Sequence, residues 1–271
     1  MKKILFFITL ASIVLAFFAI GGYRVVGSGI AKLTTDFKVL DSDDRILYEI
    51  GAKTLAEEAA QHLPQAIKDV EAKQYGSFKD PIKIYAFATA KSFSKFSGIS
   101  EAAKGGGLKN EVYLSGKLLN IMGEVQGIVT HELSHIQLSQ TLGVIKFNRT
   151  LPRWFREGLA IYVANGGGAT NATEAETIDN FLQGKHFIPK TKGTLFNQKL
   201  PSTGNLEPKI FYRQSGMFVQ YVAHNYSIQF EAFLRGLQKG NSFEPHFRES
   251  FGINTDEMLK IFILQLHDKT T

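Results

Sequence analysis

Hydrophobic side chains recur at helical spacing in the first third of the chain. Apolar residues run from Ile46 to Val70 with steps of one, three, four and five positions. This stripe predicts an amphipathic helix that begins near Asp43. Pro64 lies inside the stripe, and proline removes a backbone donor, so we expect the helix to be kinked or divided there.

Two short segments further along have the alternating pattern of β-strands. Residues 82–87 alternate directly after the break at Asp80 and Pro81, and residues 111–115 form a second short apolar run. Three consecutive glycines at 105–107 stand between them and predict a loop. The first half of the chain therefore supplies a few strands, with helices around them.

The second half of the chain predicts helices only. A long pattern covers residues 122–142 and ends at Gly143, a typical C-cap, and a second helix runs from Pro152 to about Val163. Further helical patterns follow at 174–182, 209–225, 228–238 and 255–267. Asn254 and Glu257 have the spacing of a capping box at the start of the last helix. We therefore predict an α+β fold, a small mixed sheet followed by an all-helical part.

The composition limits the chemistry that this fold can carry. Of the 271 residues 44% are hydrophobic and 21% charged, which is enough apolar surface for a packed core. The sequence contains no cysteine, so a metal ion must be bound by His, Asp or Glu. The net charge of +6 comes from scattered residues without a basic run, so we expect no nucleic-acid partner.

The N-terminus has the pattern of a membrane anchor or a signal segment, which we assign to residues 1–27. Two lysines precede an uncharged stretch at 4–22, long enough for about 28 Å of helix. We favour an uncleaved anchor over a signal peptide cleaved near residues 19–21. This predicts a membrane-anchored protein with an extracytoplasmic domain, in the bacterial periplasm or at the cell surface, or a secreted one if the segment is cleaved.

The segment His131-Glu132-Leu133-Ser134-His135 carries the main candidate chemistry. On a helix the two histidines are four positions apart, so both imidazoles lie on one face and can bind one metal ion. Glu132 can take a proton from a water on that metal without being a ligand itself. The alternative at this point is a buried helix with two hydrogen-bonded histidines.

A second motif follows at residues 154–160, Trp-Phe-Arg-Glu-Gly-Leu-Ala, with Glu157 at its centre. A lone carboxylate among large apolar residues is costly to bury unless it is paired or bound to a metal. Taken alone, Glu157 can also be a surface residue paired with Arg153. Beside two histidines it completes a His₂Glu set with one open position, the pattern of catalytic zinc sites.

The two motifs together resemble the gluzincin metallopeptidases, most closely the peptidase MA-like family. The resemblance implies a zincin-like fold over about residues 45–267, with an active-site helix that precedes the helical subdomain. It also implies one Zn²⁺ per chain, bound by His131, His135 and Glu157, and Glu132 as the general base.

The resemblance further implies how a substrate binds. Residues 111–115 would be the edge strand of the sheet, beside the active-site helix, and a peptide could add to that edge as another strand. Gluzincins often use a Tyr or His from the later helices to stabilise the oxyanion. Tyr212 is the first candidate here, followed by Arg213 and His224, and its alternative role is that of a half-buried helix aromatic.

We therefore predict a zinc metallopeptidase that hydrolyses peptide bonds in a protein or peptide substrate. Residues 28–44 would be a linker and 45–271 the metallopeptidase domain, with a sheet-containing subdomain at 45–143 and a helical one at 144–271. Two alternatives stay open, a non-hydrolytic peptide-binding module and a structural envelope protein with a coincidental motif. The sequence does not indicate the substrate or the oligomeric state.

Overall fold

The chain folds around a small mixed sheet, described here for residues 35–189 and 206–270 from a computed structural model. The strand order is β1-β2-β3-β5-β4, with β2, β3 and β5 parallel and the outer strands β1 and β4 antiparallel to their neighbours. The strands are β1 (Lys38–Leu40), β2 (Asp43–Tyr48), β3 (Lys83–Ala86), β4 (Gly105–Leu108) and β5 (Glu111–Leu114).

Side chains of the central strands alternate between two buried faces of the sheet. Ile84 is paired with Val112 and belongs to the main core, whereas Tyr113 belongs to a separate aromatic cluster with Phe93 and Phe96. Three helices and two 3₁₀ turns accompany the sheet: α3 (Lys53–Gln74) and α5 (Val125–Leu142) on the main-core side, α4 (Ala90–Ser97) on the aromatic side, and the turns η2 (Gly116–Asn120) and η3 (Met122–Glu124) before α5.

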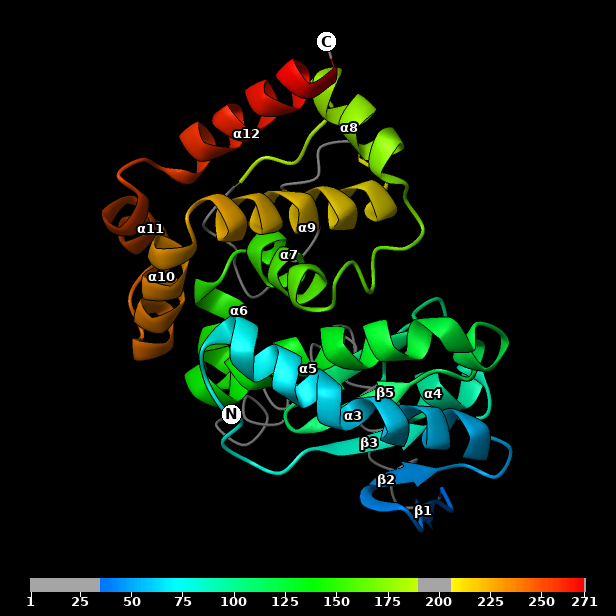
Figure 1. Ribbon diagram of the computed structural model, residues 1–271. Coiled ribbons are helices and arrows are strands. Elements are labelled where there is room, and N and C mark those ends of the chain that lie inside the picture. The colour runs from blue at the N-terminus through cyan, green and yellow to red at the C-terminus, as the bar shows by residue number, and fades with distance from the viewer. Residues whose placement is uncertain (1–34, 190–205, 271) are drawn as a thin grey trace, which may run out of the picture.

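The second half of the described chain is helical. It contains α6 (Val144–Thr150), α7 (Arg153–Val163), α8 (Glu174–Leu182), α9 (Pro208–Asn225), α10 (Ser227–Lys239), α11 (Phe243–Phe251) and α12 (Thr255–Thr270). In Figure 1 these helices stack on the side of α5 that faces away from the sheet, with α7 next to α5. Trp154 and Phe155 of α7 insert into an aromatic core with Phe218 and Phe243, which fixes α7 in place.

Helices α7 and α9 cross in close contact because glycines lie at the crossing. A Cβ atom at Gly158 would stand 2.7 Å from Val219 Cγ2 and would collide with the backbone of Ser215. Gly216 of α9 similarly leaves room for Ile161 of α7. The close approach brings the first turns of α9 next to the middle of α7, and both segments contribute to the candidate site.

The α+β prediction is confirmed, and several helix ends match. Helix α5 ends before Gly143, whose positive φ of 80° suits glycine at this position. At the start of α12 the amide of Asn254 donates to Glu257 Oε2 at 2.9 Å, and the amide of Glu257 donates to Asn254 Oδ1 at 2.9 Å. These two bonds confirm the capping box. The division into subdomains near residue 143 stays a prediction.

The helix expected from Asp43 is wrong, because Asp43–Tyr48 is strand β2 and strand β1 lies in the expected connector. Helix α3 begins ten residues later, at Lys53. Pro64 does not divide it, since the helix is continuous through the proline, which lies on its exposed face. The helices α4, α6 and α11 were not predicted.

The expected edge strand at 111–115 is also wrong. Strand β5 lies between β3 and β4, and the glycine run read as a loop forms β4, which is the strand at this edge. Gly106 and Gly107 of β4 pair with Tyr113 and Val112 of β5. The strand nearest the candidate site is thus a strand nearly without side chains.

The expected membrane anchor is corrected. The segment 1–27, to which it was assigned, lies outside the described residues. Among the helices within 35–189 and 206–270, none is both long and apolar enough to cross a bilayer; even the 22-residue α3 carries charged side chains along its exposed face. This finding overturns the expected membrane partner and the expected membrane-anchored, extracytoplasmic location.

Candidate metal centre

Three ligand atoms from two helices converge on one point. His131 Nε2 and His135 Nε2 of α5 lie 3.2 Å apart, and Glu157 Oε2 of α7 lies 3.5 Å from the first and 3.4 Å from the second. Ligand atoms with bonds of about 2.0–2.1 Å in a tetrahedral metal site stand about 3.3 Å apart. The triangle therefore has the dimensions of three ligands of one tetrahedral ion, and this cluster can bind a metal ion.

Each helix positions its ligands through its packing. Helix α5 is buried around most of its circumference, so the faces with His131 and His135 cannot turn to solvent. Helix α7 is anchored by the buried Trp154 and Phe155, and Glu157, two positions after Phe155, lies on the opposite side of the helix from Phe155. Both features follow from short local sequence patterns, which is why the three residues were identifiable beforehand.

A glycine loop after α7 holds His131 from the side remote from the cluster. His131 Nδ1 lies 3.3 Å from the carbonyl oxygen of Gly167 and donates to it, which leaves Nε2 as the ligand atom. Gly168 has a φ of 85°, and a Cβ there would stand 2.6 Å from Nδ1. Three glycines after a helix gave no sign of this role in the sequence, because it depends on contact with the distant helix α5.

The charges of the cluster stabilise each other in the absence of a metal. Burial opposes the charged form of His131, but the hydrogen bond with Glu157 and the charges of Glu132 and Glu157 raise its pKa. Burial likewise opposes the ionised form of Glu157, but His135 and His131 hold its pKa well below the usual value. A divalent cation would replace the proton that these groups share.

Glu132 lies beside the cluster without belonging to it. Its pKa is raised, first by burial and then by the charge of Glu157, while His131 and His135 act in the opposite direction. A Cβ at Gly107 of β4 would stand only 3.3 Å from Glu132 Oε2, so the glycine strand leaves room for this carboxylate. A carboxyl group with a raised pKa next to a metal cluster is the arrangement expected of a general base.

Tyr212 lines the same cavity as the cluster. Its hydroxyl oxygen accepts a hydrogen bond from Arg153 at 3.1 Å, and the negative charge of Glu157, followed by burial, raises its pKa. The structure places the other two candidates elsewhere. Arg213 and His224 line a second cavity and are not brought to the cluster.

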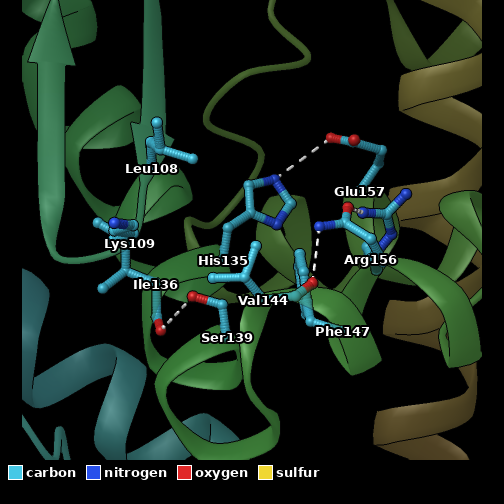
Figure 2. A pocket seen from close by; sticks show the side chains of 11 residues that line it. Leu108, Lys109, His135, Ile136, Ser139, Val144, Phe147, Arg156 and Glu157 are labelled. Carbon is cyan, nitrogen blue, oxygen red and sulfur yellow. Dashed lines mark hydrogen bonds and ion pairs between the residues drawn. The ribbon is translucent and has the colours of Figure 1, made fainter. Parts of the chain in front are cut away.

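Two hollows meet at the cluster, and β4 runs along both. The larger, about 680 Å³, is lined by His131, Glu132 and Tyr212 among others. The smaller, about 270 Å³, lies on the other side of His135 and Glu157 and ends at Arg156 (Figure 2). Arg156 was not singled out from the sequence, because an arginine within a helix has no signature of its own.

Comparisons with known proteins give no independent assignment. No protein-family model matches the chain, and no curated protein or solved structure matches it. The residues of the cluster and the two hollows beside it are therefore the features that indicate a function.

Proposed function

We propose that the chain is a zinc-dependent metallopeptidase of the gluzincin type, with a zincin-like fold. The observation that carries the proposal is the triangle of His131, His135 and Glu157, with Glu132 beside it. Two imidazoles, one carboxylate and one open position form the ligand set of catalytic zinc sites in peptidases. Calcium and magnesium are disfavoured because they require more oxygen ligands.

The roles of the side chains follow from their positions. His131, His135 and Glu157 would hold a zinc ion, which would lower the pKa of a bound water and polarise a substrate carbonyl. Glu132, once ionised, accepts the proton of the attacking water and delivers it to the leaving amine. Tyr212 has its oxygen occupied by Arg153, so its own O–H can donate to the oxyanion of the tetrahedral intermediate.

The surroundings of the cluster suit an extended peptide. Strand β4 pairs only with β5 among the described strands, so its other edge offers free backbone donors and acceptors. Its glycines at 105–107 bring that edge close to Glu132 without side chains in between. A protein or peptide segment added along β4 would pass from one hollow to the other, across the cluster.

The test is hydrolysis of a denatured protein by the full chain loaded with zinc. We expect cleavage that a chelator abolishes and added zinc restores. Glu132→Gln should retain the metal but lower turnover by about 10²–10⁴-fold, because the general base is lost. Glu57→Gln, an exposed carboxylate on α3, is the matched control and should behave like the wild type.

Two results would contradict the proposal. Full activity in the Glu132→Gln variant would remove Glu132 from the mechanism and the peptidase assignment with it. Metal binding by the wild type without turnover of any denatured protein would instead support the non-hydrolytic peptide-binding module.

A further inference from the structure

Arg156 is a largely buried cation that lacks a carboxylate partner among the described residues. One terminal nitrogen, Nη1, donates to the amide oxygen of Asn148 at 2.5 Å, and the guanidinium carbon lies 5.0 Å from the ring centre of Phe147. Nε is buried and has no hydrogen-bond partner. A guanidinium has five N–H donors, so this contact with a neutral amide leaves most of its capacity unused.

The adjacent Glu157 forms no ion pair with Arg156 among the described residues, although its negative charge acts on the guanidinium. Its Oε2 faces His131 and His135, and Figure 2 shows its carboxylate turned toward His135 while Arg156 extends beside Phe147. With a divalent ion bound, the charge of Glu157 would be engaged by the metal.

Arg156 lies in the smaller hollow, whose lining combines an apolar wall with basic residues and the polar side chains of Ser139 and Asn148. The walls are formed by Ile136, Val144 and Phe147, and Lys109 stands at the rim. Within the described part of the chain, Glu157 is the only acidic residue of this lining, and it belongs to the metal cluster. The hollow thus combines an apolar wall, suited to methylene groups, with two positive charges that would repel an amino group.

We propose that this hollow binds the carboxylate of a Glu or Asp side chain next to the scissile bond of a peptide substrate. The inference rests on the proposed peptidase function and names its substrate class. The methylenes of the acidic side chain contact Phe147 and Val144, and its carboxylate receives the N–H donors that Arg156 does not use internally. The volume of about 270 Å³ is that of a single side-chain pocket.

The first test maps the residues that flank cleavage sites. The zinc-loaded full chain is incubated with a mixed peptide library, and the products are identified by mass spectrometry. We expect Glu and Asp at one position next to the cleaved bond to be preferred over Gln and Asn by about ten-fold or more. Arg156→Gln should lower this ratio to about one, and Arg156→Lys should retain part of it.

Arg149 provides the matched control. It lies on α6 next to the hollow but is exposed and does not line it, so Arg149→Gln removes the same charge without removing the site. Circular dichroism and metal content show whether each variant is folded. An acidic preference that survives in Arg156→Gln, or disappears equally in Arg149→Gln, would overturn the inference.

A second test needs no turnover and separates the two proposals. Isothermal titration calorimetry compares glutarate, which has two carboxylates, with butyrate, which has one. Both are titrated into the zinc-loaded wild type and into Arg156→Gln. We expect glutarate to bind about ten-fold or more tighter only in the wild type. Equal binding of both acids to the wild type, or tighter binding of inorganic phosphate than of glutarate, would overturn the inference.

The failures are distinguishable. Cleavage of the library without an acidic preference refutes the inference and leaves the peptidase function intact. No cleavage by the metal-loaded wild type refutes the peptidase function, and the titration then decides by itself whether the hollow prefers a carboxylate.

Discussion

Two cavities share the helices α7 and α9, and their charged groups are arranged differently. In the second cavity, about 390 Å³, Lys73 Nζ donates to the carbonyl oxygens of Tyr162 and Val163, at 3.3 and 3.0 Å, and to Asn165 Oδ1 at 2.7 Å. Arg213, in the same cavity, pairs with Glu174 at 3.6 Å. These charges have partners within the protein.

In the metal centre the ligand atoms face one another instead. His131, His135 and Glu157 point at one position from two helices, and Glu132 stands beside them with a raised pKa. The charged groups of the second cavity thus have separate partners, whereas those of the metal centre share one position. A charged group that pairs with neighbours of its own stabilises the fold, whereas several ligand-type side chains that converge on one position from two helices can bind a metal ion there.

The largest expected effect distinguishes the two carboxylates of these cavities. Glu157→Gln should weaken zinc binding by at least about 100-fold, because an amide is a much poorer zinc ligand than a carboxylate. Glu174→Gln, in the second cavity, should leave zinc binding unchanged. Competition with a chromophoric chelator measures both, and similar affinities in the two variants would abolish the distinction between the cavities.

The two cavities also offer a pair of tyrosines. Tyr212→Phe should lower kcat by about 10–100-fold with little change in KM, because the hydroxyl stabilises the oxyanion only in the transition state. Tyr162→Phe, whose ring lies under Lys73, should have no effect on kcat. Steady-state kinetics on one peptide suffices, and an unchanged kcat in Tyr212→Phe would remove this residue from the mechanism.

The pH dependence of metal binding follows from His131. Its pKa is raised above the usual 6.5 in the metal-free protein, and only the unprotonated imidazole can bind a metal. As the pH falls through this raised pKa, protons displace the metal, so apparent zinc affinity should drop by about ten-fold per pH unit for each protonated ligand. Titrations between pH 8 and 5.5 measure this, and a constant affinity would contradict the predicted protonation.

The smallest effect concerns stability rather than chemistry. Lys73→Met removes the cation at the C-terminal carbonyls of α7, which should lower the free energy of unfolding by about 1–2 kcal/mol without changing metal content. Lys68→Met, at an exposed position on helix α3, which also carries Lys73, is the control. Thermal unfolding by circular dichroism measures both, and loss of metal from Lys73→Met would assign the second cavity to the site.

The three residues of the cluster were identifiable from the sequence because their geometry is local. The spacing of His131 and His135 on a helix already places both imidazoles on one face, and Glu157 stood out as a carboxylate within an apolar helix. Tyr212 was proposed by resemblance and lies in the cavity. Arg156 and the loop at 166–168 were not identified, because their roles depend on elements that meet only in the folded chain.

The same reasoning explains the errors in the fold. Strand propensity resides in side chains, so the glycines 105–107 gave no strand signal, and β4 forms only by pairing with β5. Ile46 happened to extend the helical stripe backwards, although the residues that α3 buries begin at Leu55. Local periodicity identified most helices, but it could not identify which strand lies at the edge.

We infer that His131, His135 and Glu157 bind one catalytic metal ion. Native mass spectrometry of the untagged full chain measures whether they do. The wild type should carry about one zinc per chain after zinc is offered, and a folded His131→Ala/His135→Ala variant should carry none. A folded wild type without bound metal, or a double variant that retains it, would contradict the account.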